Sequence, residues 1–230
     1  MPKPTEPTPS PSRRALLRGG AAVATAATAL TVTAGHALAG PGPGPAQRPS
    51  GGSAAAPGAA GPIRTADYPY SEWVPAASSN YTVANRPRTY PVEYVVIHVT
   101  QETFADTLGI FTDPAARVSA HYVVASGDGR VAQCVEEKNV AWHAGNWSYN
   151  TRSIGIEHEG WVDQPRWFTT AMYEGSARLT AFLCGYYGIP VNRSRIIGHN
   201  EVPGATHTDP GPLWDWTRYL RLVKGYLNAA

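Results

Sequence analysis

Cysteine is scarce in this chain of 230 residues, because Cys134 and Cys184 are the only two. Neither has a local pattern of partner residues around it, which argues against a thiol nucleophile, although a Cys/His hydrolase using Cys184 stays a distant alternative. In an exported protein an even pair first indicates one disulfide. Two buried free thiols are nearly as well supported, and the sequence leaves both options open.

Excess charge and long apolar runs are also lacking. The chain has 19 Lys and Arg against 17 Asp and Glu, and without residues 1–39 the balance becomes 15 basic to 16 acidic residues. No basic stripe remains, which argues against nucleic acid or an anionic membrane as a partner. No stretch beyond the N-terminal segment is apolar and long enough to span a membrane, and no internal repeat is present.

The N-terminal segment has the pattern of a processed export signal. Residues 12–18 (SRRALLR) contain a twin arginine, residues 19–34 are uncharged and moderately apolar, and residues 37–39 (ALA) form a cleavage site. The apolar run is rich in Ala, Thr and Gly and is too short for a membrane anchor. We therefore predict a twin-arginine signal peptide over residues 1–39 and a secreted protein, either extracellular or associated with the cell wall.

The remaining chain divides into a linker and one domain. Residues 40–65 are rich in Gly, Pro and Ala and predict a disordered linker, so that the folded domain covers residues 66–230. Apolar β-branched runs predict strands, and helical spacing predicts helices. The predicted strands cover residues 92–98, 118–125, 130–135, 153–159 and 195–198, with a tight turn at 126–129 and helices at 103–112, 169–187 and 214–227. This order indicates an α/β domain with a central mixed β-sheet flanked by helices.

The segment 198–216 (GHNEVPGATHTDPGPLWDW) carries the densest group of chemically active side chains. His199, His207 and Asp209 lie within eleven residues, and the prolines and glycines between them exclude one regular helix or strand. His98 ends the first predicted strand and could lie beside this loop. Two imidazoles and one carboxylate form a common set of ligands for catalytic zinc. The set could be His98, His199 and Asp209, or it could include His207, because spacing alone does not choose.

Two glutamates follow on a predicted strand, SIGIEHE at 153–159. Glu157 and Glu159 share one face of that strand, and His158 points to the other. A carboxylate beside an activated water is a natural general base, and Glu157 is our candidate. We expect Glu159 at the exposed strand end or in a supporting role.

An aromatic loop lies between these two regions. His143 follows Trp142 in the sequence AWHAG, with Trp147 close behind. Such a loop can line a substrate groove and stack on sugars, or it can simply cap the core. His121, within a predicted strand, is expected to be structural and hydrogen-bonded there.

Six segments together resemble the zinc-dependent N-acetylmuramoyl-L-alanine amidases, the type 2 amidase and peptidoglycan recognition protein family. They are YVVIHVTQ (94–101), VSAHYVV (118–124), GDGRVAQCV (127–135), VAWHAGNW (140–147), SIGIEHEG (153–160) and GHNEVPGATHTDPGPLWDW (198–216). Each segment is weak alone, but their order and spacing are specific.

The resemblance implies roles for individual residues. It maps the zinc ligands to His98, His199 and Asp209 and the catalytic glutamate to Glu157. His207 stands where the family commonly has a lysine that stabilises the oxyanion, which is a departure. The implied reaction is hydrolysis of the amide bond between N-acetylmuramic acid and L-alanine in peptidoglycan or muropeptides.

We expect a monomer with Trp142, His143 and Trp147 lining the groove. One rival is a non-catalytic peptidoglycan-recognition module of the same fold, but members of that kind have lost a zinc ligand, whereas all three positions are filled here. Another rival is an unrelated exported metalloprotein with His121 or His143 as ligands.

Overall fold

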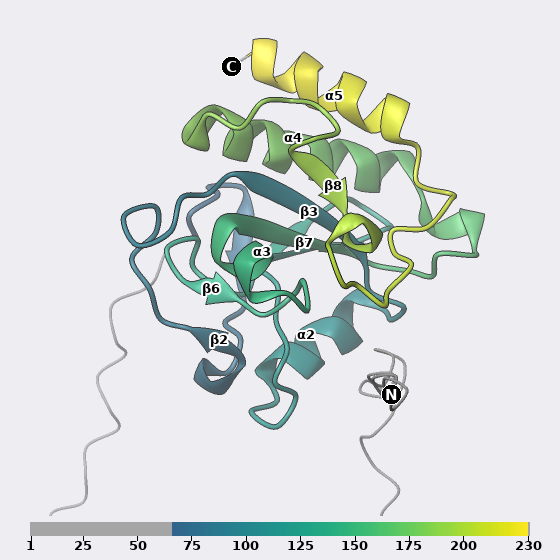
Figure 1. Ribbon diagram of the computed structural model, residues 1–230. Coiled ribbons are helices and arrows are strands. Elements are labelled where there is room, and N and C mark those ends of the chain that lie inside the picture. The colour runs from purple at the N-terminus through teal and green to yellow at the C-terminus, as the bar shows by residue number, and fades with distance from the viewer. Residues whose placement is uncertain (1–65, 230) are drawn as a thin grey trace, which may run out of the picture. The chain divides into compact units, whose positions relative to one another are not determined.

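The computed structural model describes residues 66–229, so the predicted signal peptide (1–39) and linker (40–65) lie outside the described residues. Strands and helices alternate along the chain (Figure 1). The elements are β1 (Ser71–Trp73), η1 (Ser78–Asn80), β2 (Tyr81–Thr82), β3 (Tyr94–Val99), α2 (Phe104–Thr112), β4 (Tyr122–Val124), β5 (Val131–Gln133), β6 (Val140–Ala141), α3 (Trp147–Arg152), β7 (Ser153–His158), η2 (Pro165–Trp167), α4 (Thr170–Tyr187), β8 (Ile196–Gly198), η3 (His199–Glu201) and α5 (Trp216–Asn228).

The main sheet has six strands in the order β1-β5-β4-β7-β3-β8. Strands β4 and β5 form the antiparallel hairpin, and all other neighbours in this sheet run parallel. Strands β3 and β7 lie at its centre and are almost entirely buried, as expected for apolar strands covered on both faces. The predicted α/β class with a mixed central sheet is confirmed.

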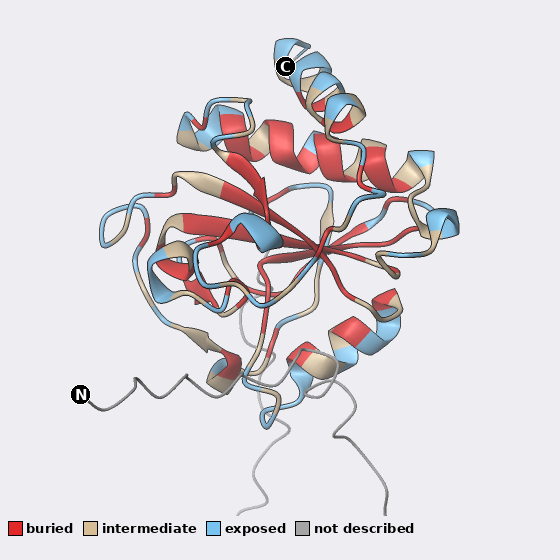
Figure 2. Cartoon of the chain, turned by 45° about the vertical axis from the view of Figure 1, so that its right-hand side comes forward, coloured by how far each residue is buried: buried red, intermediate tan, exposed pale blue. Residues whose placement is uncertain are grey.

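Helices cover both faces of this sheet. Helices α4 and α5 lie together on one side, and α2 lies on the other (Figure 1). Buried residues are concentrated in the central strands and on the inward side of α4 (Figure 2). Val95 and Ile97 of β3 belong to the core under α4 and α5, whereas Val96 belongs to a separate cluster. Because side chains alternate along a strand, His98 falls on the face of Val96, away from α4.

Local signals fix where the helices begin. The hydroxyl of Thr103 accepts a hydrogen bond from the Asp106 N–H ahead of α2, and Thr169 does the same for the Met172 N–H ahead of α4. Helix α5 begins at Trp216, two residues later than predicted. Asp215 caps it, and Trp214 instead packs in the core against Tyr173.

The strand predicted at 118–125 is shorter in the structure, where β4 covers only Tyr122–Val124. Arg117 has a φ of 56°, which interrupts an extended backbone at the start of the predicted strand. The Ser119 N–H then donates to the carbonyl of Trp142, outside the main sheet. The apolar sequence therefore extends beyond the hydrogen-bonded ladder.

Cys134 and Cys184 are both free and buried, so the disulfide alternative is not supported. They belong to different hydrophobic clusters, Cys134 with Phe104 and Phe111 and Cys184 with the core under α4. Burial raises the pKa of Cys134 well above its usual value and that of Cys184 to about 12.

None of the helices within residues 66–229 combines the length and the apolar character that a membrane crossing requires.

Candidate active site

The site begins where the two central parallel strands end. His98 on β3 and Glu157 on β7 are register partners, so their side chains leave the sheet side by side. Both are buried, and Glu157 Oε1 lies 4.0 Å from His98 Nδ1. The Glu157 carboxylate therefore lies beside the His98 ring.

The third strand, β8, contributes the loop that closes the site. His199 follows β8 immediately and is fully buried at the start of η3. Glu201 holds this turn, because its Oε2 accepts the Gly198 N–H at 2.7 Å. The chain returns to the site at Asp209, whose carbonyl accepts the Asn200 N–H at 2.9 Å.

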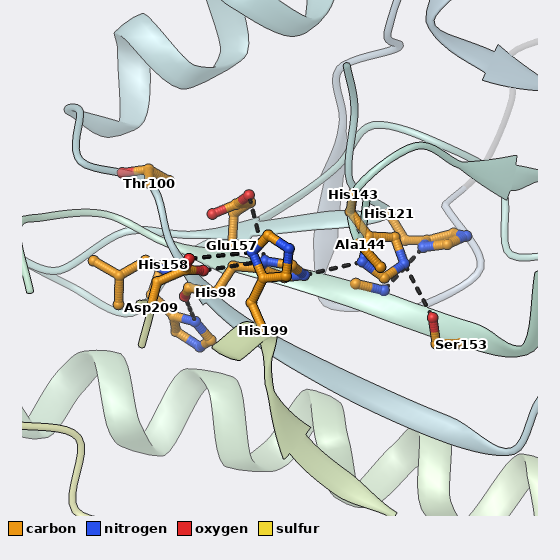
Figure 3. Close-up of polar contacts among 12 residues, drawn as sticks. His98, Thr100, His121, His143, Ala144, Ser153, Glu157, His158, His199 and Asp209 are labelled. Atoms are coloured by element: carbon orange, nitrogen blue, oxygen red, sulfur yellow. Dashed lines mark hydrogen bonds and ion pairs between the residues drawn. The ribbon is translucent and has the colours of Figure 1, made fainter. Parts of the chain in front are cut away.

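His98, His199 and Asp209 converge on one point (Figure 3). Asp209 Oδ2 lies 3.2 Å from His98 Nδ1, and Asp209 Oδ1 lies 3.1 Å from His199 Nδ1. One ligand atom from each of the three residues falls within 4.8 Å of the others, and all three residues are buried. Two imidazoles and one carboxylate at this spacing are a donor set that would fit a catalytic zinc ion.

His207 lies next to this group but does not join it. Its ring stacks on the His199 ring, with centroids 4.6 Å apart and planes inclined by 26°. His207 is partly buried, whereas His199 is fully buried. Of the two ligand sets that spacing left open, the structure brings together the one without His207.

An open cavity of about 380 Å³ adjoins the site. Trp142 and His143 line one side of it, and residues 204–207 line another, with His199 also on its wall. The indole N–H of Trp142 donates to the Thr82 hydroxyl at 2.9 Å, which fixes the ring at the cavity edge. Trp147 is not among the lining residues; it is 53% exposed and packs edge-on against Tyr90.

His143 occupies an unexpected place for a residue predicted to contact substrate. It lines the cavity but is only 1% exposed, and its Nδ1 lies 2.9 Å from Nε2 of His98 (Figure 3). No sequence pattern predicts this contact. A histidine two residues after a buried strand gives no local signal that it reaches another histidine 45 positions away.

Two other residues singled out in the sequence, Glu159 and His121, have structural contacts. Glu159 accepts the backbone N–H groups of Phe104 and Ser126, so it ties β7 to α2 and to the hairpin turn. His121 is fully buried, and its Nδ1 accepts the Gly155 N–H at 3.0 Å, which agrees with its predicted structural role. Burial and the nearby Arg86 guanidinium hold the pKa of His121 well below its usual value.

His158, predicted to point away from the site, supports it from the other face of the sheet. Its Nδ1 lies 2.8 Å from the carbonyl oxygen of His98, and its Nε2 lies 2.6 Å from the hydroxyl of Ser176 on α4. Burial lowers the pKa of His158 to about 4. A neutral imidazole therefore joins the end of β3 to the helix that covers it.

Sequence comparison matches residues 88–212, more than half of the chain, to the N-acetylmuramoyl-L-alanine amidase family. N-acetylmuramoyl-L-alanine amidase A of Achromobacter lyticus is 33% identical over 176 residues, which cover 69% of this chain and 96% of that protein. The 1,6-anhydro-N-acetylmuramyl-L-alanine amidase AmpD of Haemophilus influenzae is 39% identical over 114 residues, covering 47% of this chain and 60% of that protein.

Solved structures agree with this relationship. A selenomethionine derivative of AmpD matches with a TM-score of 0.56 at 31% identity, over 67% of this chain and 94% of that one. The Staphylococcus aureus hydrolase AmiA in complex with its ligand matches with a TM-score of 0.55 over 69% of this chain and 83% of that one. Its 18% identity supports the fold alone.

The fold and the family relationship define a type 2 amidase, a hydrolase of peptidoglycan. The chain belongs to the N-acetylmuramoyl-L-alanine amidase family, whose reaction is cleavage of the amide bond between N-acetylmuramic acid and L-alanine. The family and the enzyme class predicted from the sequence are confirmed.

Proposed function

We propose that this protein is an exported, zinc-dependent N-acetylmuramoyl-L-alanine amidase in which His98, His199 and Asp209 hold the ion and Glu157 transfers the protons. The observation that carries the proposal is the convergence of two buried imidazoles on one buried carboxylate, next to a second buried carboxylate and an open cavity.

The donor set fits zinc. Both Nδ1 atoms are turned toward oxygens of Asp209, at 3.2 Å and 3.1 Å, so all three side chains present their donors to one shared point. When bound, zinc would act as a Lewis acid that polarises the substrate carbonyl and acidifies a water molecule. His98 and His199 contribute no charge in their neutral form, so Asp209 supplies the one negative charge among the three proposed ligands.

Glu157 is the proposed proton carrier. Its carboxylate is buried and lies 4.0 Å from His98 Nδ1, beside the three converging ligands and outside that set. From there it can take a proton from the attacking water and return it to the nitrogen of L-alanine as the amide bond breaks. One carboxylate thus serves as general base and then as general acid.

His207 is proposed to stabilise the negative oxygen that forms on the lactyl carbonyl. It is partly buried, lines the cavity and stacks on the proposed ligand His199. We expect His207→Ala to lower kcat by roughly 10²-fold through loss of a hydrogen-bond donor. His207→Lys restores a cationic donor and should stay within about tenfold of the parent. Steady-state kinetics on a defined muropeptide measure both, and an unchanged kcat for His207→Ala would remove this role.

Trp142 and His143 are proposed to line the substrate groove, with Trp147 as an outer contact. Trp142 presents a ring fixed by Thr82 and covered on one side by the Arg117 guanidinium, 5.1 Å from the ring centroid. We expect Trp142→Ala to raise KM roughly three- to tenfold, in line with the energy of one aromatic contact. Trp147→Ala is the matched control and should change KM less, because Trp147 lies outside the cavity lining. Equal effects of the two variants would contradict this placement.

Residues 1–39 are proposed to direct twin-arginine export, and residues 40–65 to link the cleaved N-terminus to the catalytic domain. In a host with a twin-arginine pathway, the exported protein should begin at Gly40 by N-terminal sequencing. Replacing Arg13 and Arg14 together with lysine should retain the protein inside the cell. Export of the double variant at the parent level would argue against this route.

The reaction itself is tested on purified protein with a defined muramyl-pentapeptide and mass spectrometry. The expected product is a free stem peptide with an L-alanine amino terminus. It should disappear after chelation and return when zinc is added back. Bound zinc without cleavage would instead favour a recognition module of the same fold.

A further inference from the structure

A buried chain of polar groups extends from His98 through His143 to Ser153 (Figure 3). His98 Nε2 lies 2.9 Å from His143 Nδ1, and His143 Nε2 lies 3.1 Å from the Ser153 hydroxyl. That hydroxyl in turn lies 2.5 Å from the carbonyl oxygen of Tyr149. His98, His143 and Ser153 are each no more than 1% exposed, so the chain runs through the interior.

The far end of this chain fixes the direction of every proton in it. A backbone carbonyl only accepts, so the single proton of Ser153 Oγ points to Tyr149 O. Ser153 Oγ must then accept from Nε2–H of His143. A neutral imidazole has one N–H, which leaves Nδ1 of His143 as an acceptor for Nε2–H of His98. The lone pair of His98 is thereby assigned to Nδ1, the atom that faces Asp209.

We propose that His143 and Ser153 are positioning residues that hold His98 in the tautomer able to bind zinc through Nδ1. The inference rests on the zinc site of the proposed function. It gives His143 a task different from direct substrate contact, because both of its ring nitrogens are engaged inside the protein. A hydrogen bond to the outer nitrogen of a metal-binding histidine is a common way to fix its tautomer and ring orientation.

The surrounding structure holds the His143 ring in place. The side-chain oxygen of Asn150 accepts the backbone N–H groups of His143 and Ala144, at 3.1 Å and 2.8 Å. Gly155 of β7 provides the space for the ring, because a Cβ there would lie 2.4 Å from His143 Cγ and 2.6 Å from Nδ1. A larger residue at position 155 would therefore displace the imidazole from this position.

The test measures the zinc dissociation constant of the purified full chain by competition with a chromophoric chelator. We expect His143→Ala to raise the dissociation constant about 10- to 100-fold. His143→Asn places its Oδ1 near the position of the lost Nδ1 and should stay within about threefold of the parent. Gly155→Ala keeps every polar group of the chain but displaces the ring, so it should weaken zinc binding as His143→Ala does.

His121→Ala is the matched control. His121 is as deeply buried as His143 and its ring centroid lies 5.8 Å from that of His143, but its ring bonds to Gly155 and Arg86 and not to a proposed ligand. Its loss should lower folding stability and leave the zinc dissociation constant of the folded protein unchanged. Thermal unfolding, recorded for every variant, separates the two effects.

A second measurement identifies which ring nitrogen of His98 carries the proton. Nitrogen-15 NMR of histidine-labelled, metal-free protein should show His98 protonated at Nε2 in the parent and in His143→Asn, and a mixture of tautomers in His143→Ala. Equal loss of zinc affinity in His143→Ala and His121→Ala, or parent-like tautomers in His143→Ala, would overturn the inference. A parent protein that binds no zinc would refute the proposed function, and the NMR result would still decide the role of His143.

Discussion

Replacing Glu157 with glutamine is expected to lower kcat by about 10² to 10⁴-fold, the usual contribution of a positioned proton-transfer group. Glutamine keeps the size of the side chain but cannot take a proton from water or return one to the leaving nitrogen. Because Glu157 lies outside the group formed by His98, His199 and Asp209, the zinc content should stay at the parent level. Steady-state kinetics together with metal analysis measure both quantities.

Glu159→Gln is the control, because Glu159 directly follows the strand that carries Glu157. Glu159 accepts two backbone N–H groups, from Phe104 and Ser126, so its replacement should affect the free energy of unfolding more than kcat. A Glu157→Gln protein that keeps parent kcat, or a Glu159→Gln protein that loses kcat equally without unfolding, would remove Glu157 from the mechanism.

Loss of the metal is expected to abolish activity. Replacing His199 with alanine removes one of three proposed ligands, and the variant should lose stoichiometric zinc and at least about 10³-fold in kcat/KM, within the several kcal/mol that a Lewis acid contributes. Chelation of the parent should produce the same loss, reversed when zinc is restored. Inductively coupled plasma analysis and product assays on the same samples measure the two losses together.

His207→Ala provides the comparison, since the two rings stack 4.6 Å apart. This variant should keep its zinc although its kcat falls. Zinc should also raise the unfolding temperature of the parent, because a ligand at 100 times its dissociation constant stabilises the folded state by about 2.7 kcal/mol. That increase should be absent in His199→Ala. Zinc retained at full stoichiometry in His199→Ala would mean that the ligand set is wrong.

The elements most fully predictable from the sequence were those with strong local patterns. The apolar runs that became β3 and β7, and the helix that became α4, were located to within two residues at each end, because burial on both strand faces and a threonine cap leave clear signatures. The start of α5 and the length of β4 were wrong. Both depended on tertiary packing, since Trp214 joined the core and Arg117 took a left-handed backbone.

The site was only partly predictable for a similar reason. Local spacing identified His199, His207 and Asp209 as candidates, but the choice among them depends on β8 lying beside β3. The path from His143 to His98 also depends on a glycine at position 155, on strand β7, which leaves space for the His143 ring. Contacts between residues on different strands depend on how the strands pair in the sheet. Local sequence patterns therefore do not predict them.

The two free cysteines have a consequence for where this protein can fold. Since no covalent link joins Cys134 to Cys184, formation of the native structure requires no oxidation step. Burial also raises both thiol pKa values, which keeps the reactive thiolate scarce. The architecture is therefore independent of the ambient redox potential, and neither thiol reductants nor mild oxidants should change its activity.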